Sequence, residues 1–473
     1  MEKTAKVNKI DIISGPLFVN ILRFMLPLIV TNLLQQFFHA ADVVIVGLSP
    51  EPDGVGAVGS TGSFLSLIRN IYMGFSVGTN VVVARCIGLG DKEKISRVVH
   101  TSVSISVIFG LIGSVAGIIL TRPVLVGMGY TGNLLRLAAR YAYIRFLFIP
   151  LSALLNFLGA IIRAQGNTKT PMLILSFSGV LNVCMNLFFV LVTRLSVEGV
   201  AIATGLSQLI SVVLMWRYLL KKGNDCRISF NKLRIHREEF IEVFGIGFPA
   251  GIQNSLFSLS NMVIQSSILQ VNNLIVPTDS AYAPVIKGNA SASSIENFFV
   301  TALGAVTATS STFTAQNAGA NKYDRIRKSL HYICLISGAF ALIMSLFGIL
   351  LRQPLLALYG VRKNVDFLGD IAYNTAITRM TYKWPLLCAF AVMNACSGAI
   401  RGLGKSTMSA AITFVGTCAF RVVWIYTVFA WLKNLESIYI SYPISWLITG
   451  ALFFVIVHKL INNRIKENEN RSA

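Results

Sequence analysis

Ala84-Arg-Cys-Ile-Gly-Leu-Gly-Asp-Lys92 recurs in altered form about 231 residues later, as Ala315-Gln-Asn-Ala-Gly-Ala-Asn-Lys322. A second stretch, Asn156-Phe-Leu-Gly-Ala-Ile-Ile-Arg-Ala-Gln-Gly166, recurs about 238 residues later as Asn394-Ala-Cys-Ser-Gly-Ala-Ile-Arg-Gly-Leu-Gly404. Both pairs keep their order, and both lie in polar segments where contact with lipid does not dictate the composition. The repeats indicate a duplicated membrane bundle, which is typical of transporters whose substrate site lies between the two copies.

The composition indicates a polytopic membrane protein. Of the 473 residues, 54% are hydrophobic and 13% are charged, whereas a soluble protein carries about 25% charged residues. Apolar runs long enough to cross a bilayer recur along the whole chain. The net charge of +21 would suggest nucleic acid as a partner of a soluble protein, but here the basic residues gather in alternate loops. A globular enzyme and a nucleic-acid-binding protein are therefore disfavoured.

Length and hydropathy predict an all-α integral membrane protein of about twelve transmembrane helices, in two pseudo-symmetric six-helix lobes. Because each lobe holds an even number of spans, both copies enter the membrane from the same side. The pseudo-twofold axis then runs along the membrane normal, which makes this a parallel repeat. The expected spans are 19–46, 60–86, 97–120, 137–161, 171–193, 197–219, 241–270, 282–314, 329–351, 371–399, 408–432 and 437–460.

The basic residues also predict the orientation and the division into lobes. The connections on one side of the membrane, together with both termini, hold about 25 Lys and Arg, and those on the other side hold about 7. This asymmetry places both termini in the cytoplasm and predicts a multi-pass protein of the inner (plasma) membrane. The basic connection at 221–240 is expected to link an N-lobe at 1–220 to a C-lobe at 241–473. Its charges are interpreted as attracted to anionic lipids rather than as a ligand site.

Four groups of residues occur at spacings known from one transporter family. They are Leu26-Pro27 through Gln35-Gln36 to Asp42 and Gly47, then Gly88-Leu-Gly-Asp91, Arg163-Ala-Gln-Gly166, and Gly199-Val-Ala-Ile-Ala-Thr204 with Gln208. Together they resemble the MATE (multidrug and toxic compound extrusion) transporters, over about residues 15 to 460. The resemblance implies a secondary-active multidrug efflux antiporter that exports organic, often cationic, compounds in exchange for H⁺ or Na⁺ by alternating access.

Asp42 is the clearest functional candidate, because it lies inside the first span about fifteen residues after Pro27. An ionised carboxylate within a bilayer costs at least about 3 kcal/mol, so such residues usually face a cavity and serve a function. The alternative is an acid near the outer end of the helix that faces the lipid headgroups. The resemblance favours the functional reading, because the family's first-helix carboxylate matches this position.

Asn182 and Asn186 are one turn apart on the fifth span, so their amides share a face. The resemblance places them beside Asp42, together with Thr204 of the sixth span. Some family members carry Asp at the position of Asn186, so this chain has one carboxylate fewer. The carboxylate, amides and hydroxyl suit Na⁺ as hard ligands, but they equally suit a hydrogen-bond network around a proton. Hydrogen bonding between helices is the simpler role of each Asn.

Other side chains of the first span are candidates for contact with coupling ion or substrate. His39 lies three residues before Asp42, on the same helix face, where it can hydrogen-bond the carboxylate and make coupling sensitive to pH, or be satisfied locally. Gln35, Gln36 and Phe38 offer amides and a ring to a planar cationic substrate. Because they point in several directions, some of them must face lipid.

The C-lobe lacks a counterpart of Asp42. The part of its first helix around Gln253 carries no acid, and Glu296 of the eighth span is the acid expected in the C-lobe core. Lys287 lies on roughly the opposite face of that span, so Arg421 of the eleventh span is the expected partner of Glu296. Such a pair is either structural or a switch that responds to substrate. We assign all four residues to the substrate cavity.

Some family members carry acids in the seventh and tenth helices. Here the tenth span has Lys383-Trp-Pro385 instead, which disfavours a Na⁺ site like the one those acids would form. Apart from a possible Na⁺ at Asp42, Asn182 and Asn186, no metal site is expected, and no cofactor other than the coupling ion.

The repeated loops are interpreted as turns rather than as chemistry. Their glycines fit tight cytoplasmic turns, and Arg163 and Arg401 fit helix C-termini, where cations are favourable. The glycines concerned are Gly88, Gly90, Gly166, Gly319 and Gly404. The seven cysteines have no CxxC spacing and predict neither disulfides nor a metal centre.

Three functions remain in competition. The first is the multidrug antiporter, acting as a monomer on small drug-like molecules within the lipid bilayer. The second is a lipid-linked saccharide flippase of the same broader superfamily, which would need helices beyond twelve and a strongly basic cavity. The third, a membrane-embedded enzyme, is disfavoured because the sequence contains no catalytic constellation.

Overall fold

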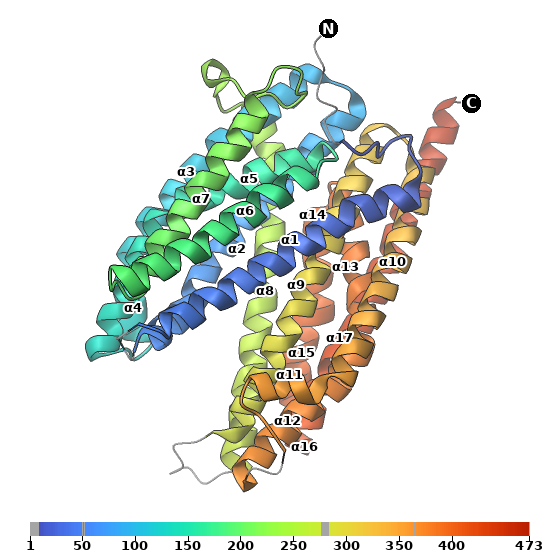
Figure 1. The fold of residues 1–473 in the computed structure, drawn as a ribbon. Helices are drawn as coiled ribbons and strands as arrows, with labels where there is room; N and C mark the ends of the chain where they lie inside the picture. Colours follow the sequence, from blue (N-terminus) through green and yellow to red (C-terminus); the bar gives the residue numbers. More distant parts are fainter. Residues whose placement is uncertain (1–8, 50, 52, 276–282, 364–365, 473) are drawn as a thin grey trace. The chain divides into compact units, whose positions relative to one another are not determined.

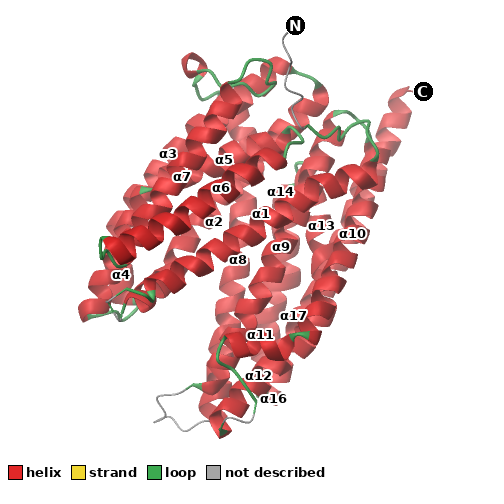
Figure 2. Ribbon diagram, viewed as in Figure 1, coloured by secondary structure: helices red, strands yellow, loops and turns green. Residues whose placement is uncertain are grey.

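The computed structural model describes residues 9–49, 51, 53–275, 283–363 and 366–472, and every regular element within them is a helix (Figures 1 and 2). The chain divides into two compact units. The first comprises Met1–Ile252 and Ala315–Ala320, and the second comprises Gln253–Thr314 and Asn321–Ala473. The prediction of an all-α membrane protein is thereby confirmed.

The helices follow the expected spans closely. In the first half they are α1 (Leu17–Val46), α2 (Gly54–Leu89), α3 (Lys92–Gly127), α4 (Gly132–Leu147), α5 (Ile149–Ala164), α6 (Lys169–Leu187) and α7 (Val197–Leu220). In the second half they are α8 (Arg237–Ile275), α9 (Pro284–Gly319), α10 (Tyr323–Leu350), α11 (Arg352–Leu358), α12 (Phe367–Lys383), α13 (Leu387–Gly402), α14 (Ser406–Thr413), α15 (Phe420–Trp424), α16 (Ala430–Leu432) and α17 (Leu435–Ser472).

Ten helical stretches of the described chain are long and apolar enough to cross a membrane, and α4 with α5 forms an eleventh. The seventh expected span coincides with α8, which has 39 residues but is not among these eleven. Its polar run of Gln253, Asn254, Ser255 and Ser258 lowers its hydropathy. A span of this kind needs partners for its polar groups inside the protein.

Two spans that the sequence predicts as continuous are broken at a proline. Helices α4 and α5 meet at a bend of 47°, where Pro150 opens α5. Between α12 and α13 the residues Trp384–Leu386 form a 3₁₀ turn that contains Pro385. Proline has no N–H to donate and its ring clashes with the preceding turn, so a helix kinks or changes pitch there.

Each unit packs around long helices. In the first unit α1 lies against α6, and α2 contacts α3, α4 and α5. In the second unit α13 packs against α10 and α17, and α12 packs against α17 (Figure 1). Both candidate sites lie on these packed helices, so helix contacts fix the positions of their side chains.

The basic connection between α7 and α8 is docked on α3. The backbone N–H of Ser229 donates to His100 Nε2 at 2.9 Å, and that of His236 donates to Thr101 Oγ1 at 3.1 Å. Cys226 is fully buried there, and burial raises the pKa of its thiol. The Cys226 thiol therefore stays protonated and unreactive at neutral pH.

The repeated loops correct one prediction. Gly90, Gly166 and Gly404 have positive φ values of 74°, 82° and 80°, as turn residues should. Gly88 and Gly319 instead belong to helices α2 and α9. A Cβ on Gly88 would meet the carbonyl oxygen of Gln316, and one on Gly319 would meet that of Arg85. All four positions belong to the first unit.

This contact is reciprocal, because Gly88 and Gly319 are separated by the same interval as Arg85 and Gln316. The two copies of the repeated loop therefore touch each other through equivalent backbone positions. Glycine is required at both because any side chain would collide with backbone, which cannot swing aside as a flexible side chain can.

Gly88→Leu is expected to destabilise the first unit by about 1–3 kcal/mol, because the new side chain must push α2 away from residues 315–319 at the end of α9. Gly62→Leu on the same helix is the matched control, since a Cβ there meets nothing within 4 Å. The measurement is the thermal unfolding midpoint of each purified variant in detergent. Equal midpoints for the two variants would contradict the assigned contact.

Candidate functional site: two buried carboxylates

The first site centres on Asp42 of α1. Its side chain is buried, with 8% of its surface exposed, and it accepts a hydrogen bond of 2.5 Å at Oδ1 from the Nδ2 amide of Asn186. None of the ion pairs within the described residues includes Asp42. Asp42 is thus a buried acid held by a neutral donor alone.

The amides of Asn182 and Asn186 and the hydroxyl of Thr204 form a chain of polar contacts that begins at the Asp42 carboxylate. Asn186 Nδ2 also lies 3.4 Å from Oδ1 of Asn182, and Asn182 Nδ2 lies 3.5 Å from Thr204 Oγ1. Thr204 in turn donates to the carbonyl of Val200 at 2.8 Å. The structure therefore brings Asp42, Asn182, Asn186 and Thr204 together from α1, α6 and α7.

One acceptor of this group is left over. The Asn186 Oδ1 atom is buried and has no hydrogen-bond partner. A buried acceptor without a partner is destabilising unless a proton, an ion or water occupies it in another state. Asp42 and Asn186 therefore offer oxygen atoms that suit a bound cation or a proton.

Close packing of α1 on α6 sets the positions of these groups. The ring of Phe38 lies over Gly179, where an added Cβ would collide with it. Of the remaining first-span candidates, Gln35 and His39 are exposed and Gln36 is half-buried. No hydrogen bond joins His39 to Asp42 in the described part of the chain, so the structure does not place His39 in this network.

Sequence reasoning missed one residue near Asp42. Arg145 of α4 lies in the neighbourhood of Asp42 and His39, is half-buried, and has a buried Nε atom without a hydrogen-bond partner. Arg145 lies within the expected span 137–161. An arginine inside an expected span is a signal by which the sequence could have identified this residue, because intramembrane arginines are rare and usually functional.

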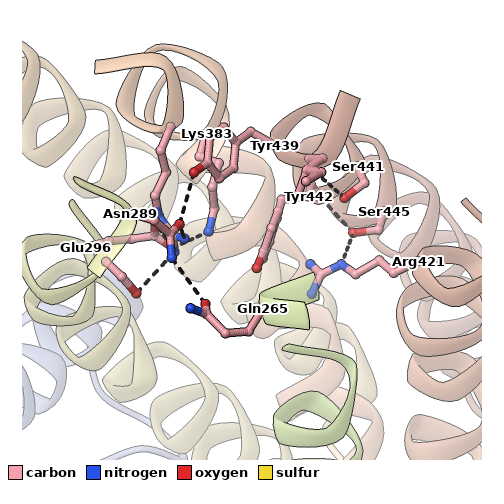
Figure 3. Close-up of polar contacts among 12 residues, drawn as sticks. Gln265, Asn289, Glu296, Lys383, Arg421, Tyr439, Ser441, Tyr442 and Ser445 are labelled. Atoms are coloured by element: carbon pink, nitrogen blue, oxygen red, sulfur yellow. Dashed lines mark hydrogen bonds and ion pairs between the residues drawn. The ribbon is translucent and has the colours of Figure 1, made fainter. Parts of the chain in front are cut away.

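The second site centres on Glu296 of α9, and here the expected partner is wrong. Glu296 pairs with two bases of α12, through 2.6 Å from Oε1 to Lys383 Nζ and 3.1 Å from Oε2 to Arg379 (Figure 3). Arg379 and Lys383 are one helical turn apart, so both reach the same carboxylate. Arg421 instead donates from Nε to Ser445 Oγ at 3.0 Å.

Arg379 also donates hydrogen bonds to other polar side chains near Glu296. Arg379 Nη1 donates to Asn289 Oδ1 at 2.7 Å, and Nη2 donates to Ser293 Oγ at 3.2 Å. Asn289 Oδ1 also accepts from the Tyr439 hydroxyl at 3.1 Å. Arg379 therefore has a hydrogen-bond partner at each of its three nitrogens.

The other two C-lobe candidates lie outside this cluster. Lys287 of α9 is exposed. Gln253 is buried in a separate network, where its Oε1 accepts from Arg401 at 2.7 Å and its Nε2 donates to Thr413 Oγ1 at 2.5 Å. Gln253 thereby ties α8 to α13 and α14 within the second unit.

Comparison with known proteins decides the family. A family model described as MatE matches residues 27–188 and 249–427, which is well over half of the chain. The chain belongs to the MatE family. The resemblance drawn from the sequence motifs is thereby confirmed.

Relatives and solved structures agree with this assignment. The probable multidrug resistance protein YoeA of Bacillus subtilis is 28% identical over 340 residues, covering 69% of this chain and 70% of YoeA. The multidrug export protein MepA of Staphylococcus saprophyticus is 22% identical, covering 55% of this chain and 57% of MepA.

Two solved transporters share the fold at 20% identity. One is an outward-facing multidrug resistance MATE family transporter of the MOP superfamily, which matches with a TM-score of 0.87 over 98% of this chain and 100% of that chain. The other is a MOP superfamily transporter from Pyrococcus furiosus, with a TM-score of 0.88 over 98% and 99% of the two chains.

Glu296→Gln is expected to lower the stability of the protein by about 3–5 kcal/mol, because it leaves Arg379 and Lys383 buried without their counter-charge. The double variant Glu296→Gln with Lys383→Met should recover part of the loss. Glu467→Gln, which breaks the exposed pair with Arg464, is the matched control. A thermal midpoint of Glu296→Gln equal to that of Glu467→Gln would show that the Glu296 pairs do not stabilise the fold.

Proposed function

We propose that this chain is a secondary-active multidrug efflux antiporter, which exports organic, often cationic, compounds in exchange for H⁺ or Na⁺ by alternating access. Membership of the MatE family and the names of its multidrug relatives support the substrate class. The single observation that carries the coupling step is Asp42, a buried membrane carboxylate that forms no ion pair within the described residues.

The state of Asp42 links the ion to the drug. A lone carboxylate inside a bilayer is strongly disfavoured as an anion, so it must be protonated, bind a metal ion or face a cationic substrate. Only one of these can neutralise it at a time. The inward ion and the outward drug therefore compete for one negative charge, and this competition is the basis of exchange transport.

Helix α1 supplies the moving part of the proposed mechanism. Pro27 lies inside α1, fifteen residues before Asp42, and interrupts the hydrogen-bond ladder of that helix. Protonation or Na⁺ binding at Asp42 removes the attraction to a cationic drug and permits α1 to bend or repack. The drug is then released, and the vacated carboxylate is reset when the ion leaves.

Two coupling ions fit the residues around Asp42. Na⁺ is transported rather than resident, and it would take oxygen ligands from Asp42, from the unpartnered Asn186 Oδ1 and from Asn182. A proton would sit on the Asp42 carboxylate and be donated to an amide oxygen of the same group. These oxygen atoms suit either ion. The coupling ion is therefore identified by measuring transport without Na⁺ and at different pH values.

The setting of the transporter follows from its charge pattern and its relatives. We place it as a multi-pass protein of the inner (plasma) membrane with both termini in the cytoplasm, as the distribution of Lys and Arg predicts. It acts as a monomer, with no cofactor beyond the coupling ion. A lipid-linked saccharide flippase would need spans beyond the twelve expected, whereas the described residues contain ten or eleven helical stretches of membrane-spanning length and hydropathy, besides α8.

Asp42→Asn is expected to abolish coupled efflux, because the amide can neither be protonated nor attract a cation. The measurement is efflux of a fluorescent organic cation from cells, with and without Na⁺ and across pH 6 to 8, at matched expression. Asp324→Asn, which alters an exposed acid paired with Arg327, is the control and should transport normally. Efflux by Asp42→Asn at the rate of the unaltered protein would overturn the coupling assignment.

A further inference from the structure

The buried cluster of the second unit carries more positive than negative charge. It contains three bases, Arg379, Lys383 and Arg421, which are 5%, 1% and 2% exposed. Glu296 is the one carboxylate that takes part in the ion pairs of this cluster within the described chain. With all three bases protonated the cluster has a net charge of +2. Even with Lys383 neutral a charge of +1 remains, because arginine stays protonated in proteins.

Two of the bases converge on one aromatic ring. Lys383 Nζ lies 3.5 Å from the centroid of the Tyr442 ring, and the Arg421 guanidinium carbon lies 4.3 Å from it. Figure 3 shows Tyr442 between the Glu296 group and Arg421. Attraction to the ring offsets part of the cost of burying these cations. It does not remove the repulsion between them.

Arg421 retains unused donors at this point. Its Nε atom donates to Ser445, and neither Nη atom donates to an acceptor among the residues that the structure describes. The Nη atoms are also not among the fully enclosed polar atoms of those residues that lack a partner, so they are open to a small molecule. Arg379, by contrast, is bonded at all three nitrogens. Guanidinium N–H groups that have no acceptor in the protein but are not fully enclosed can donate to water or to a ligand. The two Nη groups of Arg421 can therefore donate to an acceptor from outside the chain.

We propose that Arg421 and Lys383, on either side of Tyr442, form a binding site in the second unit for an oxyanion group carried on an aromatic body. A guanidinium fork binds carboxylate or phosphate oxygens in a bidentate manner, and a lysine adds a point charge. The ring of Trp446 lies 5.8 Å from Lys383 Nζ. Tyr442 meets Trp446 edge to face and Phe390 meets it at a tilt, so aromatic rings that could contact an aromatic body lie beside these bases. Glu296 stays paired with Arg379 and Lys383, so its carboxylate is not available to bind a cation.

This site is separate from the group around Asp42 and takes ligands of the opposite charge. The proposal concerns binding only, and it stands whether or not the chain exports cationic drugs. If both sites act in transport, the substrates of the second are organic acids or the acidic groups of zwitterions.

The test is equilibrium dialysis of radiolabelled benzoate with the purified full-length protein, at constant ionic strength. Saturable benzoate binding is expected, with competition by unlabelled benzoate and by phenyl phosphate, but not by benzamide, which has the same shape without the charge. Stronger competition by phenyl phosphate than by benzoate would assign the site to phosphates, and the reverse to carboxylates. Absence of saturable binding of either anion, or equal competition by benzamide, would overturn the proposal.

Substitutions of Arg421 test whether benzoate binds at this residue. Arg421→Gln is expected to weaken benzoate binding about ten- to hundredfold, because charge-assisted hydrogen bonds are lost. Arg421→Lys should retain more of the affinity than Arg421→Gln. Arg464→Gln, which alters an exposed arginine, should bind as the unaltered protein does. If Arg421→Gln does not fold, the competition pattern and Arg421→Lys still decide the matter. Unchanged affinity in a folded Arg421→Gln would place the anion elsewhere and contradict the assignment.

Discussion

A charge buried in a bilayer must be neutralised, and this requirement organises the chemistry of the whole chain. An ion loses its hydration when it enters the hydrocarbon core, and the penalty is several kcal/mol even after the protein relaxes around it. The carboxylates of the two candidate sites meet the requirement in different ways. Glu296 is neutralised within the protein by Arg379 and Lys383. Asp42 has a single neutral donor, so its neutralisation depends on what arrives from outside.

The repeat explains the scaffold, whereas the departures from the repeat carry the chemistry. Each of two equivalent glycines, Gly88 and Gly319, lies against the backbone of the other loop copy. Turn glycines recur at Gly166 and Gly404. Asp42 has no acidic counterpart in α8, and the cationic cluster around Tyr442 has no counterpart of the same charge around Asp42. A duplicated scaffold with different charges in its two halves can bind ions of opposite sign in each.

Much of this could be predicted from the sequence. Helix periodicity places Asn182 and Asn186 on one face, and the family resemblance places that face next to Asp42; their hydrogen bonds agree with both. The partner of Glu296 could not be predicted, because it depends on how α9 and α12 pack, and sequence spacing carries no information on that contact. Gly88 and Gly319 were misassigned for a related reason. Glycine serves turns and close helix contacts alike, and only the fold distinguishes them.

In the proposed mechanism the coupling ion and the cationic drug compete for Asp42. The most direct test is the equilibrium affinity of the purified protein for a fluorescent organic cation, measured across pH and across Na⁺ concentration. Binding of the organic cation is expected to weaken as the concentration of either H⁺ or Na⁺ rises, by up to about tenfold per pH unit if one proton is displaced. Asp42→Asn is expected to lose this dependence. An affinity for the organic cation that is independent of both H⁺ and Na⁺ in the unaltered protein would contradict this competition.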